Sequence, residues 1–193
     1  MQKELLSRRA FFNSLKDATG KSVILLSMPA LLHACRESRQ ARLAGEDFQT
    51  ITEEEAIEFD AITARIIPTT ETAGAREAGV VFFMDAVLGD SREEQHAILK
   101  DGLRELQSAA VQEFDVAYFH LLDARQQDQL IESISDTSFF FTLRYLTIAG
   151  MFSLPEYGGN RDFVGYDVIG YQNRGAWTQP YSFYDADFTE RGE

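Results

Sequence analysis

Three helix-start signals along the middle of the chain constrain its fold more than any other feature. In a capping box, an N-cap side chain and a residue three positions later each satisfy a free amide of the first helical turn. The pairs with this spacing are Thr52 with Glu55, Ser91 with Glu94, and Asp123 with Gln126. Because no alternating apolar and polar pattern accompanies them, the chain is expected to be all-α.

Apolar residues spaced three and four positions apart predict about five helices packed as one compact bundle. The expected helices run from Thr52 to before Pro68, then over roughly 75–88, 91–114, the stretch from Asp123, and 138–152. The expected core positions are Ile57, Ala61, Ile62, Ala64, Ile66, Ala78, Val81, Phe82, Met84, Leu99, Leu103, Leu106, Ala110, Leu130, Ile131 and Ile134. The last helix is apolar on nearly every side and is therefore expected at the centre of the bundle.

After Pro155 the chain becomes rich in glycine and aromatic residues, with few positions at helical spacing. We expect an irregular C-terminal extension from about residue 155, whose aromatic side chains must find apolar surface to cover them. Since neither a repeat nor a second apolar pattern is present, residues 36–193 are expected to form a single domain.

The first 35 residues have the order of zones found in an export signal. The stretch SRRAFF, with Arg8, Arg9 and Phe11, precedes an apolar run at 22–34 that is too short for a membrane helix of about 20 residues. The pattern resembles a twin-arginine signal, which sends folded proteins to the bacterial periplasm. The alternative is an amphipathic N-terminal helix with two surface arginines.

The single cysteine, Cys35, ends a stretch, Leu32-His33-Ala34-Cys35, that resembles a lipobox. In a lipobox the cysteine is lipidated and begins the mature protein, which would tether the domain to a membrane. The alternative is a cysteine without this role, either buried or removed with the signal. One cysteine excludes an internal disulfide and a cysteine-based metal cluster.

The net charge and the few histidines argue against two classes of function, nucleic-acid binding and metal-dependent catalysis. The net charge of −13 argues against nucleic acid as a partner, because nucleic acid requires a basic face. Glu93 and His96 have the i, i+3 spacing of di-iron bundles, but such sites need this motif twice and the sequence holds it once. His120 is expected to be a hydrogen-bonded core residue. We therefore assign no catalytic, cofactor-binding or metal-binding residue, and expect the chain not to be an enzyme by itself.

Three stretches carry a family resemblance: FDAITARIIPTT at 59–70, GAREAGV at 74–80 and FSLPEYGGN at 152–160. With GYDVIGY at 165–171, they resemble the gluconate 2-dehydrogenase subunit 3 family, the small subunits of bacterial sugar dehydrogenases, over roughly residues 52–172. The resemblance implies a non-catalytic helical subunit bound to a large FAD-dependent subunit of the glucose-methanol-choline type, often with a haem-containing cytochrome c subunit.

The same resemblance implies that the twin-arginine signal serves both subunits, so that the large one is carried through the translocase with the small one. Membrane association would then arise through the partner or through a lipid anchor. Substrates across such complexes include gluconate, glucose, fructose and glycosides, and the sequence does not select among them.

On this interpretation the C-terminal extension contacts the partner. Aromatic side chains offer large contact areas with few rotatable bonds, and glycine allows close backbone approach. The predicted contact residues are Pro155, Tyr157, Gly158, Gly159, Asn160, Tyr166, Tyr171 and Trp177. The alternative, which applies to Phe163 and Tyr166 above all, is that the aromatic residues fold back onto the chain's own helices.

Two other functions remain open at this point. The first is a free-standing exported lipoprotein that binds a ligand in its aromatic extension, based on Cys35 and the composition of that extension. The second is a metal-dependent helical enzyme, based on Glu93 and His96.

Overall fold

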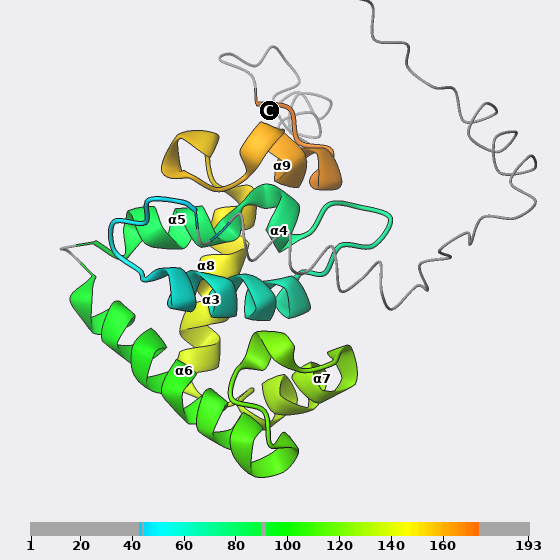
Figure 1. Cartoon of the computed structure of the whole chain (residues 1–193). Coiled ribbons are helices and arrows are strands. Elements are labelled where there is room, and N and C mark those ends of the chain that lie inside the picture. The colour runs from blue at the N-terminus through cyan, green and yellow to red at the C-terminus, as the bar shows by residue number, and fades with distance from the viewer. Residues whose placement is uncertain (1–42, 44, 90–91, 174–193) are drawn as a thin grey trace, which may run out of the picture. The chain divides into compact units, whose positions relative to one another are not determined.

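The computed structural model describes residue 43 and residues 45–89 and 92–173, all within the unit Arg42–Glu193. These residues form helices and no strands (Figure 1), which confirms the all-α class. The twin-arginine stretch, Cys35 and Trp177 lie outside the described residues. The helices are α3 (Glu53–Ile66), α4 (Ala75–Ala78), α5 (Val80–Val87), α6 (Glu93–Phe114), α7 (Ala124–Ser133), α8 (Ser138–Phe152) and α9 (Val164–Ile169), and the 3-10 turns are η1 (Phe119–Leu121), η2 (Pro155–Tyr157) and η3 (Arg161–Phe163).

Helix α3 begins at the first predicted capping box. The Thr52 hydroxyl accepts from the Glu55 amide at 3.2 Å, and the Glu55 carboxylate accepts from the Thr52 amide at 2.9 Å. The helix ends before Pro68, where Ile67 is non-helical (φ −126°, ψ 88°) because the proline ring disfavours the α conformation of its predecessor. Phe59 is fully buried on the inner side of this helix.

The second predicted helix is interrupted at Gly79, so the single helix expected over 75–88 is wrong. Gly79 is left-handed (φ 69°, ψ 36°), a conformation that glycine adopts without steric cost, and it separates α4 from α5. The break places Phe83 in the core. Phe82, which the sequence pattern places there, is only half-buried and stacks on Phe48 with ring centroids 5.5 Å apart.

Helices α6 and α7 differ in how they begin. The N-cap of α6 is Arg92, without a side-chain cap, so the box predicted at Ser91 does not set its start; Ser91 itself is outside the described residues. Helix α7 begins as predicted: the Asp123 carboxylate accepts from the Gln126 amide, and the Gln126 side chain accepts from the Asp123 amide, both at 3.0 Å. The buried core positions confirmed in these helices are Leu99, Leu103, Leu106, Ala110 and Leu130.

Helix α8 packs on the core with one side, whereas its other side is exposed, so the expectation of a helix at the centre of the bundle is met only in part. It contacts α3, α4, α5, α6 and α9, and Figure 1 shows it running past α3 and α5 toward α9. Its buried residues are Phe139, Leu143, Leu146, Thr147, Gly150 and Met151.

The segment after Pro155 is more regular than the sequence suggests. In place of an irregular extension, residues 155–169 form η2, η3 and α9, and α9 packs on α8 and α4. The turns are short and contain left-handed residues: Asn160 before η3, and Asp162 and Phe163 within it, with φ of 43°, 54° and 59°. No helical period survives such breaks, so the sequence pattern could not reveal these turns.

Asp85 of α5 anchors the chain that leads into α3. Its Oδ1 atom accepts from the amides of Thr50 at 2.8 Å and Ile51 at 3.0 Å, and its carboxylate also accepts from the Gln49 amide at 3.1 Å. A single carboxylate thereby satisfies three backbone donors that no helix satisfies.

Candidate partner-binding surface

The turn that follows α8 is built on close backbone approaches. A Cβ atom at Gly159 would lie 2.2 Å from the Gly150 carbonyl oxygen, and one at Gly165 would lie 1.8 Å from that of Met151. Hard-sphere repulsion forbids both distances, so only glycine allows the chain to lie this close to the end of α8. These two glycines therefore serve the packing of the chain on itself.

Asn160 is fully buried and joins the end of α8 to the start of α9. Its Nδ2 atom donates to the Ser153 carbonyl, its Oδ1 atom accepts from the Gly165 amide, and its own amide donates to the Gly150 carbonyl, each at 2.8 Å. Its left-handed backbone is one that asparagine tolerates better than most residues. The PEYGGN stretch is thus a clamp within the domain.

The predicted partner contacts divide into buried and exposed residues. Those buried by the chain's own atoms are Gly159, Asn160 and Tyr166, and those half-buried are Pro155 and Gly158. Tyr157 and Tyr171 are 52% and 42% exposed, and their contact with a partner stays a prediction. Of the two aromatic residues for which folding back was the main alternative, Tyr166 does fold back, whereas Phe163 is exposed.

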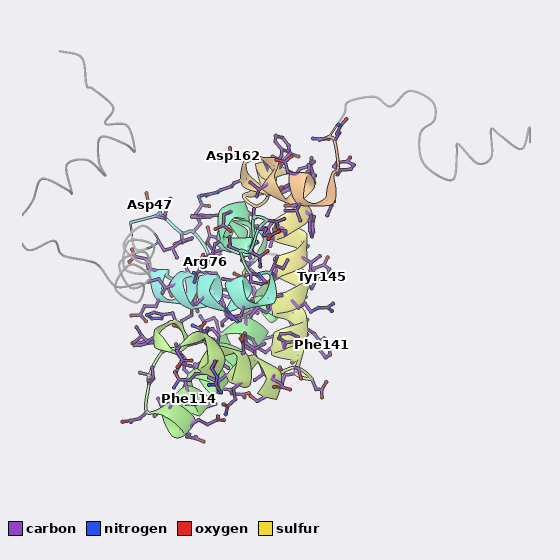
Figure 2. All side chains as sticks on the ribbon, turned by 90° about the vertical axis from the view of Figure 1, so that its right-hand side faces the viewer. Asp47, Arg76, Phe114, Phe141, Tyr145 and Asp162 are labelled. Carbon is purple, nitrogen blue, oxygen red and sulfur yellow. The ribbon has the colours of Figure 1, made fainter. Side chains whose placement is uncertain are left out.

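A further apolar surface lies on α8, which the sequence pattern does not predict. Phe141, Tyr145 and Ile148 are 56%, 64% and 41% exposed. Their spacing of four and three residues places them on one side of the helix. Figure 2 shows Phe141 and Tyr145 pointing away from the rest of the domain. We call these three residues the α8 outer face.

The α8 outer face is hidden in the sequence because apolar residues occupy nearly every side of this helix. A helix that is apolar all round is expected to be buried all round, yet this one is covered only on its inner side by the described residues. Arg144 is the single signal that could have located the face. It is the one charged residue of α8, it is exposed, and it lies three and four positions from Phe141 and Ile148. Because arginine is rarely buried without a partner, it marks the solvent side of such a helix.

A shallow hollow of about 320 Å³ lies between the α8 outer face and the first turn of α6. It is lined by Arg92, the N-cap residue of α6, by Gln95 of α6, and by Phe141, Thr142, Tyr145 and Leu146 of α8. Helix α8 carries no carboxylate, although the chain as a whole has a net charge of −13. The residues that form the face and line the hollow are therefore mostly apolar and include no carboxylate, and the charged residues among and beside them are Arg92 and Arg144.

A buried polar cluster lies elsewhere in the domain, between α3 and η1. The Glu58 carboxylate is 1% exposed, accepts from the Phe119 amide at 2.9 Å and from the His120 amide at 3.3 Å, and pairs with the His120 ring. His120 is thus a hydrogen-bonded residue, as predicted. The carboxylate satisfies amides at the start of the η1 turn, which gives the pair a structural role.

The two residues of the candidate metal pair, Glu93 and His96, lie in different surroundings. His96 turns toward α3, where its Nε2 atom is 3.8 Å from a carboxylate oxygen of Glu55, while Glu93 is exposed in the first turn of α6. Across residues 45–89 and 92–173, no three or more His, Cys, Asp or Glu side chains are grouped so as to hold a metal ion. None of the helices in these ranges has both the length and the apolar character needed to cross a membrane.

Comparison with known proteins gives one match. The family model described as gluconate 2-dehydrogenase subunit 3 matches residues 53–173, which include α3 to α9, the PEYGGN clamp and the α8 outer face. The chain has no match among curated proteins and none among solved structures.

Proposed function

Because this chain belongs to the gluconate 2-dehydrogenase subunit 3 family, we propose that it is the non-catalytic accessory subunit of an FAD-dependent dehydrogenase that oxidises a sugar or sugar acid. On this proposal the catalytic flavoprotein is a separate large subunit of the glucose-methanol-choline type, and FAD is bound there. A cytochrome c subunit accepts the electrons in complexes that contain one. The present chain stabilises the large subunit and escorts it during export.

The family match over residues 53–173 carries this proposal, and the α8 outer face, which the other described residues leave uncovered, supports it. Burial of apolar surface stabilises an assembly by roughly 25 cal/mol per Å². Two aromatic side chains that are more than half exposed, Phe141 and Tyr145, forgo that stabilisation in the isolated domain. Protein interfaces concentrate their binding energy in a few aromatic and arginine residues, and the α8 outer face with Arg144 has this composition.

The export signal fits the same proposal. Translocation in the folded state suits a flavoprotein that acquires FAD in the cytoplasm, and one twin-arginine signal at Arg8 and Arg9 would serve both subunits. The assembled complex would then act in the periplasm, at the membrane if a lipid on Cys35 or the partner holds it there.

Co-purification from the native host tests the proposal. An epitope-tagged full-length chain should bring down a flavoprotein with bound FAD and a sugar or sugar-acid dehydrogenase activity from the periplasmic or membrane fraction. The double change Arg8→Lys and Arg9→Lys should leave both proteins in the cytoplasm. Lys16→Arg, a change within the same basic segment, is the matched control and should not affect export. Recovery of the tagged chain without a flavoprotein, or normal export of that flavoprotein with the double variant, would refute the proposal.

The Cys35→Ser variant distinguishes the two modes of membrane attachment. If a lipid on Cys35 is the anchor, the variant releases the complex into the soluble periplasm, and mass spectrometry finds acyl groups on the wild-type cysteine alone. If the partner is the anchor, the complex stays in the membrane fraction with either residue.

A further inference from the structure

We propose that the α8 outer face, together with Arg144 and the adjoining hollow, is the surface that docks the flavoprotein subunit, through a complementary surface that is apolar and carries carboxylates. This inference rests on the proposed function and deepens it, because it assigns the contact to α8. The sequence resemblance points instead to the extension after Pro155.

The geometry favours α8 over the PEYGGN clamp. Phe141, Tyr145 and Ile148 project from one rigid helix whose other side is fixed in the core, so their positions are set before a partner arrives. Preorganised aromatic residues lose little conformational entropy on binding. The conspicuous residues of the clamp, Gly159 and Asn160, are already engaged within the domain.

The shallow hollow beside the face extends the contact surface. With a volume of about 320 Å³ between Arg92, the N-cap residue of α6, and Tyr145 of α8, it can accept part of a side chain of the partner. Binding energy at interfaces is concentrated where a side chain of one protein fills such a hollow of the other.

Charge defines the chemistry of the partner. Arg144 is exposed at the edge of the α8 outer face, Arg92 lines the hollow, and neither forms an ion pair within the described residues. The acids that follow Arg92, Glu93 and Glu94, do not line the hollow. Complementary potentials govern recognition between surfaces, so the partner should place carboxylates opposite the two arginines.

A second copy of the chain fits this surface poorly. Arg144 lies next to the midpoint of α8, Ser138–Phe152. In a symmetric dimer that pairs the two helices antiparallel about their midpoints, the twofold axis would bring both Arg144 side chains together. Like charges brought close together within an interface oppose association, which favours an acidic partner over self-association.

Photo-crosslinking in the full-length chain identifies the occupant directly. A benzophenone side chain replacing Tyr145 should crosslink to the flavoprotein that the wild-type chain retains, identified by its bound FAD and by mass spectrometry. The same group replacing Leu121, an exposed residue of η1, should give no such product. Crosslinks from position 145 to residues 174–193 of this chain, to a second copy, or to nothing while the complex is intact, would each overturn the inference.

Substitutions at exposed positions test the energetics without disturbing the core. Tyr145→Ser should weaken the complex about 30-fold, as expected for an exposed aromatic residue that the partner covers. Arg144→Glu should also weaken it about 30-fold, because the reversed charge would face the partner's carboxylates. Arg144→Lys should retain much of the affinity. The matched controls are Leu121→Ser for the loss of an exposed apolar group and Arg125→Glu on α7 for the charge reversal, and both should bind normally.

The outcomes separate this inference from the proposed function. If the wild-type chain binds no flavoprotein, the accessory function itself fails. If the wild-type chain binds it and the Tyr145 and Arg144 variants bind equally well, the function stands and the assignment to α8 is wrong.

Discussion

The Oδ1 atom of Asn160 accepts a hydrogen bond from the backbone amide of Gly165 at 2.8 Å, which connects the turn after α8 to the start of α9. Replacing Asn160 with alanine removes this bond and the one to the Ser153 carbonyl, and it leaves both backbone partners without a bond. We expect Asn160→Ala to lower the free energy of unfolding by about 3 kcal/mol, measured by urea denaturation of the full-length chain. Asn173→Ala, at an exposed position, is the control. Equal stability of the two variants would contradict the conclusion that the Asn160 hydrogen bonds stabilise the domain.

Gly165 tolerates no side chain, because a Cβ atom there would lie 1.8 Å from the Met151 carbonyl oxygen. Gly165→Ala should destabilise the domain by roughly 3 kcal/mol or more, since backbone rather than a flexible side chain must move. Gly89 offers a matched control, because a Cβ atom at that position would have the Thr50 hydroxyl oxygen, at 3.8 Å, as its nearest neighbour. A thermal melt in which Gly165→Ala and Gly89→Ala unfold together would show that α9 is not packed tightly on the end of α8.

Glu58→Gln tests the buried cluster at η1. The glutamine amide turns two donors toward a site that already holds the donors of Phe119 and His120, so one or more hydrogen bonds must be lost in a buried place. We expect a loss of about 2 kcal/mol in the free energy of unfolding. The same chemical change at an exposed position, Glu105→Gln, should have little effect. Co-purification with the flavoprotein should persist where Glu58→Gln remains folded, and a specific loss of binding by the folded variant would assign the cluster to the interface instead.

Asp85→Ala should release the segment before α3. Three amides lose their acceptor, and faster hydrogen exchange at Gln49, Thr50 and Ile51 should report it, with a stability loss of about 2 kcal/mol. Asp85→Asn keeps one carbonyl oxygen as an acceptor and should have a smaller effect. If exchange at these three amides is as slow in Asp85→Ala as in the wild type, the anchor is not what holds the segment.

Local signals predicted the helices well where the signal and its partner were close in sequence. The boxes at Thr52 and Asp123 define helix starts through a residue three positions away. The same spacing at Ser91 and Glu94 does not set the start of α6, whose N-cap is Arg92, so spacing alone is not sufficient. The sequence pattern did not predict the break between α4 and α5 at Gly79, because a glycine is compatible with a continuous helix. Whether the helix continues through it depends on tertiary contacts. Here the side chain of Arg161 lies over the Phe82 ring, 3.5 Å from its centroid, and occupies the space that a Cβ at position 79 would need. No pattern within 75–88 contains that information.

The candidate site was harder to predict. Glycine and aromatic residues after Pro155 suggested a contact region, but composition does not say whether an aromatic side chain faces its own chain or another. Tyr166 is buried against its own chain, whereas Phe163, three residues before it, is exposed although its ring lies beside that of Tyr166. The sequence pattern did not predict the α8 outer face, because apolar residues occupy nearly every side of this helix. Arg144, its one charged residue, is the only indication of which side is exposed to solvent.

Helix α8 builds the core with one side and presents Phe141, Tyr145 and Ile148 on the other, so binding of a partner to this face would link assembly to folding. A ligand that binds only the native state raises stability in proportion to the logarithm of its concentration. A protein seated on α8 would therefore protect the entire domain from unfolding and from proteases, while unassembled copies would be degraded first. By this route the cell could keep the two subunits in balanced numbers without a dedicated regulator.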